Sequence, residues 1–153
     1  MRLRNIPGAD EAIVQSPYCI QDAAAYAGKW YTLFPQKAPL HIEIGMGKGQ
    51  FIMGMAKAHT DINYIGIEKY TSVLLRAVQK MEAEETPLDT LRFLCFNAED
   101  IAEIFAPGEV DRIYLNFSDP WPKDRHAKRR LTSSAFLDRY DQILAKGGHI
   151  EFK

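Results

Sequence analysis

The feature that most constrains the fold is a short apolar segment that runs directly into a glycine-rich turn. Residues 40–44, Leu-His-Ile-Glu-Ile, have the length and the branched side chains of a buried β-strand. The sequence GMGKG follows at 45–49, and residues 50–59 have the pattern of a helix. Glycines here let the chain turn sharply and bring the N–H groups of a helix start close to a ligand. We therefore predict a strand–turn–helix unit with a ligand at the turn.

Strands and helices alternate along the rest of the chain. We expect further strands at 63–68, 91–96, 110–117 and 149–152, helices at 71–84, 100–105 and 132–144, and a helix stop at 146–148. Such alternation requires right-handed crossovers and places helices on both faces of the sheet. The predicted fold class is α/β, with a Rossmann-like, doubly wound, mainly parallel sheet. Ligands of such sheets bind at the carboxyl ends of the strands.

The chain changes character near residue 36. Residues 1–36 contain several prolines and, apart from a short helical segment at 21–27, no sustained periodicity, so we expect an N-terminal arm. Residues 37–153 should form the α/β domain. With 153 residues, 46% of them apolar, the chain has the size and composition of one domain with a real core. Because the sequence stops at the fifth strand, we expect the domain to be truncated there, with its C-terminal part absent.

Composition argues against several classes of protein. Cys19 and Cys95 lie far apart and neither belongs to a CxxC pair, which disfavours a disulfide scaffold and a zinc site. His126 has no second histidine or cysteine at ligand spacing, so we expect no metal. No apolar run approaches the roughly 20 residues that cross a bilayer, and the N-terminus lacks a signal-peptide core. We therefore expect a cytoplasmic protein with no membrane partner.

The glycine turn fits one ligand better than its rivals. The P-loop pattern GxxxxGK[ST] is absent, and the dinucleotide pattern GxGxxG fails because Gln50 occupies its third glycine position. What remains is GxGxG, formed by Gly45, Gly47 and Gly49, with Glu43 two residues before it. S-adenosylmethionine has no phosphate and carries a sulfonium and an ammonium cation, so an acidic strand end suits it better than it suits a pyrophosphate. We predict S-adenosylmethionine as the cofactor.

Two more polar residues follow predicted strands. Glu68 ends the second strand, where it could accept hydrogen bonds from both ribose hydroxyls of an adenosine. Asn97 follows the third strand and could hydrogen-bond an adenine edge. The alternative is that Glu43 and Glu68 are ordinary solvated acids and that Asn97 only forms a turn. Taken together, the three residues favour a ligand site.

A second group of residues begins where the fourth strand should end. Asp119 is followed by Trp121 between two prolines, which fix φ on both sides of the indole and make the loop stiff. Such a loop would hold Asp119 and Trp121 aligned before a substrate arrives. The alternative is that Trp121 only packs and Asp119 only caps a turn.

A block of cations follows this loop, in a chain whose net charge is only -1. Its members are Lys123, Arg125, His126, Lys128, Arg129 and Arg130. A local basic block on an acidic body predicts a face that binds phosphates, next to an indole that can stack on a base. A solvated basic helix start is the plainer alternative.

These motifs resemble one known family. EIGMGKG at 43–49, GIE at 66–68, YLNF at 114–117 and above all DPWPK at 119–123 with RHAKRR at 125–130 resemble the bacterial tRNA (guanine-N7-)-methyltransferases, which have the class I methyltransferase fold. The resemblance implies methyl transfer from S-adenosylmethionine to N7 of a guanine in the tRNA variable loop, by a monomer or homodimer. S-adenosylhomocysteine would be the second product.

The resemblance also implies roles for individual residues. Glu43, Glu68, Asn97 and Asp119 would contact the cofactor or lie beside it. Asp119 would be the active-site acid, Lys123 would meet the substrate, and residues 125–130 would contact the RNA. The family domain continues past this sequence with a Thr/Glu segment that helps to hold the guanine, and those residues are missing here.

The chemistry expected of such an enzyme needs no general base. Guanine N7 has an in-plane lone pair and no hydrogen, so catalysis would rely on alignment and electrostatics. Asp119 could accept from the guanine N1–H or N2–H groups, or stabilise the developing positive charge.

Two rival functions stay open. One is an exocyclic-amine nucleic-acid methyltransferase, although its D/N-P-P-aromatic loop would place the aromatic residue one position later. The other is a catalytically inactive RNA-binding protein of the same fold.

Overall fold

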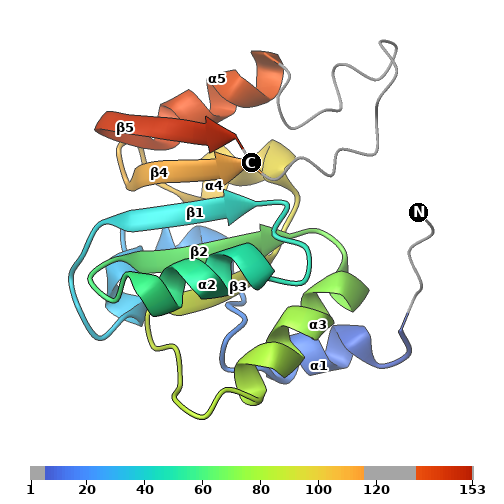
Figure 1. Ribbon diagram of the computed structural model, residues 1–153. Helices are drawn as coiled ribbons and strands as arrows, with labels where there is room; N and C mark the ends of the chain where they lie inside the picture. Colours follow the sequence, from blue (N-terminus) through green and yellow to red (C-terminus); the bar gives the residue numbers. More distant parts are fainter. Residues whose placement is uncertain (1–5, 116–133, 153) are drawn as a thin grey trace.

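The computed structural model describes residues 6–115 and 134–152, which build a five-stranded sheet (Figure 1). The strands are β1 (Leu40–Ile44), β2 (Asn63–Glu68), β3 (Leu91–Cys95), β4 (Val110–Leu115) and β5 (Leu144–Phe152). They lie in the order β3-β2-β1-β4-β5, and every pairing is parallel. The chain runs from β1 outward to β3 and then returns to the other side of β1. The strand order therefore reverses between β1 and β4, which confirms the doubly wound sheet.

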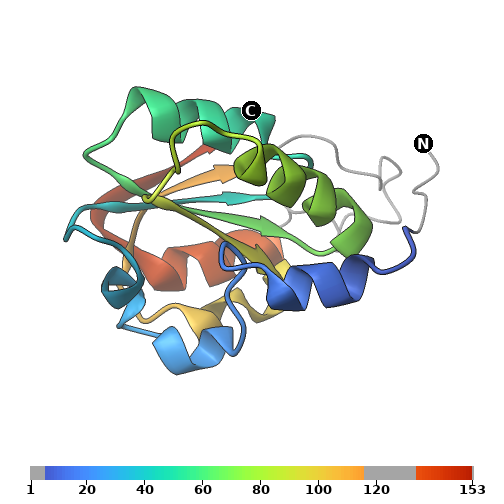
Figure 2. The same ribbon diagram turned by 90° about the horizontal axis from the view of Figure 1, so that it is seen from below.

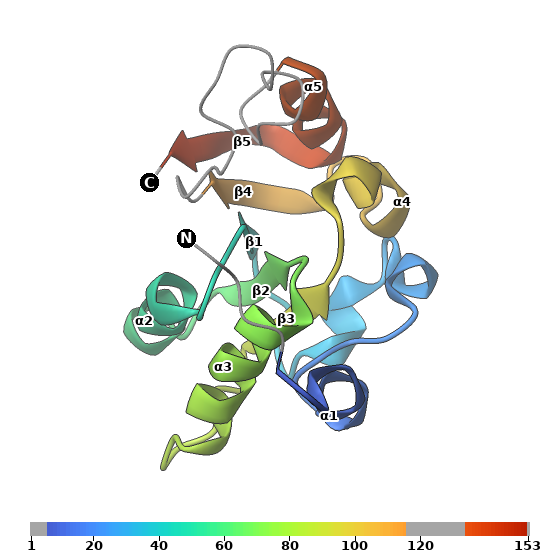
Figure 3. The same ribbon diagram turned by 90° about the vertical axis from the view of Figure 1, so that its right-hand side faces the viewer.

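Helices cover both faces of this sheet (Figure 3). On one face α2 (Gln50–Ala58) and α3 (Thr71–Glu82) connect the first three strands, and on the other α4 (Ile101–Ile104) and α5 (Ser134–Ile143) follow β3 and β4. All five residues of β1 and all six of β2 are buried, as expected for central parallel strands. No helix in the described part of the chain has the length and apolar character needed to span a membrane.

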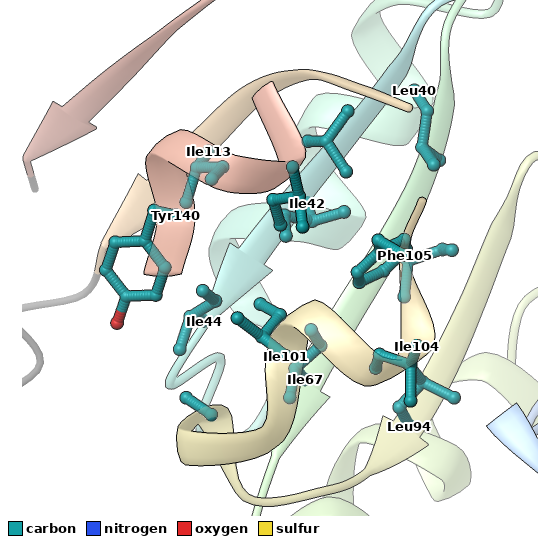
Figure 4. Close-up of a cluster of buried hydrophobic side chains, with 14 of the residues drawn as sticks. Leu40, Ile42, Ile44, Ile67, Leu94, Ile101, Ile104, Phe105, Ile113 and Tyr140 are labelled. Carbon is teal, nitrogen blue, oxygen red and sulfur yellow. The ribbon is translucent and has the colours of Figure 1, made fainter. Parts of the chain in front are cut away.

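The core on the α4 and α5 face is mainly aliphatic (Figure 4). Ile42 and Ile44 of β1 pack there with Ile67 and Ile113 from the strands on either side. Ile101 and Ile104 of α4 and Tyr140 of α5 close the cluster from above the sheet. Alternate residues of β1 point to the opposite face, which leaves His41 and Glu43 facing the α2 side.

Residues 6–36 lie against the α/β domain. Helix α1 (Ala9–Gln15) packs along α3 (Figure 2). The Ile20 N–H donates to the Phe93 carbonyl at 2.9 Å and the Phe93 N–H to the Tyr18 carbonyl at 2.7 Å, so this segment covers the outer edge of β3. The Trp30 side chain is fully buried, and its Nε1–H donates to the Ile104 carbonyl at 2.6 Å. Short 3-10 helices occur at Ala23–Tyr26 and Trp30–Leu33.

The boundaries of the last elements differ from the sequence prediction. Residues 146–148, predicted as a helix stop, lie inside β5, because α5 ends at Ile143 and the strand begins at once. The pairing of β4 with β5 shifts between Val110 and Arg112, and Gly147 has φ +85°. Gly147 therefore serves an irregularity within the strand, where its positive φ favours glycine as it would at a helix end. Residues 116–117 and 132–133 of the predicted elements lie outside the described residues.

Glu109 ties the N-terminal segment to the domain. Its carboxylate accepts from the N–H groups of Gly28 at 2.8 Å, Trp30 at 3.3 Å and Ala106 at 2.9 Å. We expect Glu109→Ala to lower the free energy of unfolding by about 2 kcal/mol, because it removes the common acceptor of three backbone donors. Urea denaturation would measure the change. Glu103→Ala, which truncates an exposed acid on α4, is the control and should leave stability close to wild type.

His41 should make the fold sensitive to acid. The side chain is 7% exposed and lies edge-on to Tyr64, and burial, reinforced by Arg112, lowers its pKa from 6.5 to about 4. Between these values the unfolded chain binds a proton that the folded chain does not. This contribution to stability is therefore complete above pH 6.5 and is lost as the pH falls toward 4, by about 3 kcal/mol at most.

The check is the pH dependence of unfolding for wild type and His41→Phe. The variant cannot titrate at this position, so its stability should fall less steeply across the same window. Equal slopes for the two proteins would contradict the assignment.

Candidate functional site

The carboxyl ends of β1 and β2 bring two predicted cofactor residues to one edge of the sheet, where the strand arrows in Figure 1 end. Glu43 of β1 lies in register with Gly66 of β2 and with Tyr114 of β4. Glu68 closes β2, in register with Cys95 of β3. Both acids are buried, with exposures of 0% and 8%. They are therefore not the solvated acids of the plainer alternative.

The glycine turn is fixed to the end of β2 through its backbone. The N–H groups of Gly45 and Met46 both donate to the Ile67 carbonyl, at 2.9 and 3.1 Å. The Gly49 N–H then donates to the Met46 carbonyl at 3.1 Å and closes the turn. Gly45, Gly47 and Gly49 all have positive φ, a region in which other residues are strained.

The glycines of the turn have different surroundings. A Cβ added to Gly47 would meet nothing within 4 Å, so the backbone there is open to a ligand. A Cβ on Gly49 would lie 3.0 Å from Cβ of Ala77, because α3 packs closely against the start of α2. Gly49 is the N-cap residue of α2 and has no side chain. It therefore provides no side-chain acceptor for the first N–H groups of that helix.

Glu68 joins two loops at this edge. Its Oε1 accepts from the Gly47 N–H at 3.0 Å and its Oε2 from the Tyr70 N–H at 3.1 Å. Burial raises the pKa of this carboxyl, while the two backbone hydrogen bonds act in the opposite direction. Each carboxylate oxygen can accept a further hydrogen bond, so Glu68 can hold the two loops and still bind a pair of hydroxyls.

Asn97 begins the 3-10 helix η3 (Ala98–Asp100) just after β3. Its Oδ1 accepts from the Glu99 N–H at 3.0 Å, so it is indeed a turn former. A backbone N–H can only donate, which fixes the orientation of the amide and directs the NH₂ group away from the turn. Asn97 is exposed, and its NH₂ can therefore donate to a ligand.

Residues 119–130 lie outside the described residues. This applies to Asp119 and Trp121 of the proline-flanked loop and to the cations Lys123, Arg125, His126, Lys128, Arg129 and Arg130. The strand that leads toward them, β4, lies directly beside β1.

Sequence reasoning overlooked Met46 and the loop after Glu68. Met46 lies within the turn but is only 2% exposed, whereas Tyr70 is 40% exposed with the Lys69 Nζ 5.0 Å from its ring centre. A large apolar residue between two glycines was a signal for a buried anchor. In the described parts of the chain, no group of three or more His, Cys, Asp or Glu side chains is arranged to hold a metal ion.

Two cavities formed by described residues lie elsewhere. One of about 310 Å³ lies at the amino ends of the strands, beside Leu40, Asn63 and Asp111. Its carboxylates already serve the backbone, since Asp111 accepts from the Leu40 N–H at 2.8 Å. Another, also about 310 Å³, lies beside β3, lined by Cys95 and Phe96. The geometry at the end of β1 and β2, rather than cavity volume, marks the candidate site.

Solved structures with a similar fold include methyltransferases. The aminoglycoside resistance methyltransferase NpmB1 matches 82% of this chain and 60% of its own, with a TM-score of 0.64 and 23% identity. A protein from Methanococcus maripaludis described as a "putative s-adenosyl-l-methionine-dependent methyltransferase" matches 99% of this chain and 67% of its own, with a TM-score of 0.57 and 18% identity. At these identities the likeness shows the fold alone.

Sequence comparison gives the family. A family model described as "Putative methyltransferase" matches residues 37–153. The tRNA (guanine-N(7)-)-methyltransferase of Lachnoclostridium phytofermentans is 63% identical over 153 residues, and that of Bacillus subtilis is 51% identical over 154. Each match covers the whole of this chain and 71% of the relative. The chain belongs to the family of bacterial tRNA (guanine-N(7)-)-methyltransferases.

Proposed function

We propose that the protein transfers the methyl group of S-adenosylmethionine to N7 of a guanine in the tRNA variable loop. Membership of the family supports the reaction and the substrate. The observation that carries the cofactor assignment is the position of Glu68, buried at the end of β2 and hydrogen-bonded to the glycine turn. That arrangement leaves acceptors for the hydroxyls of a ribose beside a backbone without side chains.

The described residues fit S-adenosylmethionine. Glu68 would accept from the ribose hydroxyls, and the open backbone at Gly47 would let the ligand approach closely. The NH₂ group of Asn97 would donate to a ring nitrogen of adenine. Glu43, a carboxyl at the end of β1, would favour the positive charge of the methionine part. The Gly45 and Gly49 backbones complete the turn.

The cofactor supplies an electrophilic methyl group. The N7 lone pair forms the new bond to the methyl carbon while the carbon–sulfur bond breaks, and its electron pair stays on sulfur. S-adenosylhomocysteine leaves as a neutral thioether and the guanine gains the positive charge. No proton leaves the nucleophile, so the protein contributes alignment and electrostatics rather than a base.

The residues after β4 complete the proposal. Asp119 would either accept from the guanine N1–H or N2–H groups or stabilise the charge on the methylated ring. Trp121 would stack on a base, and Lys123 would meet the substrate. Arg125, His126, Lys128, Arg129 and Arg130 would bind tRNA phosphates.

The direct test is methyl transfer to unmodified tRNA. We expect 7-methylguanosine in a nucleoside digest and chain cleavage at that base within the variable loop. An N-methylated exocyclic amine would instead indicate the rival methyltransferase. Absence of both cofactor binding and methyl transfer in the wild-type protein would favour an RNA-binding protein without activity.

Asp119→Ala tests whether Asp119 acts in methyl transfer or in cofactor binding. Turnover should fall, while the Kd for S-adenosylhomocysteine changes less.

Glu68 should contribute strongly to the affinity for the cofactor. We expect Glu68→Ala to raise the Kd for S-adenosylhomocysteine about tenfold to a hundredfold, because hydrogen bonds to a charged acceptor are lost. Isothermal titration calorimetry measures this. Glu99→Ala truncates an exposed acid at the same edge and keeps the N–H that Asn97 needs, so its Kd should stay near wild type.

The same carboxyl should give binding a pH dependence. Because burial raises the pKa of Glu68, it protonates at a higher pH than an exposed glutamate. Affinity should therefore fall as the pH is lowered, and Glu68→Gln should remove most of that fall. An identical pH profile in the variant would argue against a contact between Glu68 and the ribose.

A further inference from the structure

We propose that Met46 is a positioning residue for cofactor binding, whose buried side chain sets the spacing between the glycine turn and the end of β2. The proposal rests on the function proposed above, since this spacing defines the ribose site. It assigns to Met46 a role that acts through Gly47 and Glu68 and involves no contact with the ligand.

The first observation is the packing of the Met46 side chain. Met46 is 2% exposed and belongs to the apolar cluster beneath α2 and α3. A Cβ on Gly66, in the middle of β2, would collide with the Met46 Sδ, and a Cβ on Gly49 would lie 3.2 Å from the Met46 Cε. The methionine therefore fills the space that two glycines leave, one in the turn and one in the strand.

Gly66 supports this interpretation. Glycine weakens a strand interior, and Gly66 does not have the positive φ that would require it. It pairs in register with Glu43 and Phe93, and the aromatic ring of Phe93 lies 3.3 Å from the position that a Cβ would take. The close approach of Met46 explains why no side chain fits here.

The second observation is the backbone pairing next to this contact. Met46 donates its N–H to the Ile67 carbonyl at 3.1 Å. The residues that follow these two in the sequence, Gly47 and Glu68, form the bond from the Gly47 N–H to Glu68 Oε1. A shift of Met46 away from β2 would therefore lengthen the Gly47–Glu68 contact. The atoms in the way of a methyl group at Gly66 are the distal Sδ and Cε of Met46. Because that side chain is buried in a densely packed cluster, moving these atoms should also displace the turn that carries it.

The test is a pair of substitutions that should compensate. Gly66→Ala adds a methyl group against Met46, and we expect the Kd for S-adenosylhomocysteine to rise about tenfold. Adding Met46→Ala to that variant removes the atoms in the way and should bring the Kd back to within about threefold of wild type. In methyl transfer, KM for S-adenosylmethionine should follow the same pattern while kcat changes less.

Gly54→Ala is the matched control. Gly54 is an exposed glycine of α2, and an added Cβ would meet nothing within 4 Å. Its Kd should equal that of wild type. Thermal unfolding of each variant separates loss of fold from loss of affinity.

Several results would overturn the proposal. A folded Gly66→Ala variant with wild-type Kd would do so. Failure of Met46→Ala to restore binding in the double variant would also do so, and would point to Phe93 as the obstacle.

If Gly66→Ala does not fold, single substitutions of Met46 in the otherwise wild-type chain test the proposal instead. Met46→Ala should raise the Kd several-fold, whereas Met46→Leu should keep it within about twofold because its volume is similar. Equal values for both would overturn the proposal. A wild-type protein that binds no S-adenosylhomocysteine would instead contradict the proposed function.

Discussion

The candidate site depends on the hydrogen bond from the Gly47 N–H to the Glu68 carboxylate. This bond joins the turn after β1 to the end of β2. The residues that follow the two strands are therefore held together as one site. It requires a carboxylate at 8% exposure, and burying such a group is costly unless it is hydrogen-bonded. The second bond, from Tyr70, adds to this compensation. The raised pKa of Glu68 shows that burial still outweighs these bonds.

Three glycines around this bond are present for different physical reasons, and only Gly47 and Gly49 belong to the GxGxG motif. Gly47 has a positive φ and open space in front of it, which is what a ligand needs. Gly49 has a positive φ and also meets Ala77 of α3. Gly66 lacks a positive φ and makes room for Met46. A GxGxG pattern therefore reports backbone conformation, helix packing and ligand access together.

The sequence predicted well those parts that local patterns control. The bounds of β1 and β2 agree with the structure because both segments are short, rich in isoleucine and bounded by residues typical of turns or helix starts. Long-range packing could not be predicted from local sequence patterns. Nothing local shows that Trp30 enters the core or that Glu109 binds two N–H groups of a distant segment. The start of β5 was misjudged because paired glycines serve both helix ends and strand irregularities.

The order of the charges along the sequence suggests that the cofactor and the RNA bind to different strands of the sheet. Glu43 and Glu68, on β1 and β2, suit a cationic cofactor but would repel an RNA backbone. The cations from Lys123 to Arg130 all follow β4 in the sequence, and β4 lies on the other side of β1 from β2. The reversal of strand order thus separates an acidic half from the strand that leads to a basic segment. A methyl donor held by the first half and a polyanion held by the second would meet near the end of β1. In this arrangement one sheet edge can accept two ligands of opposite charge.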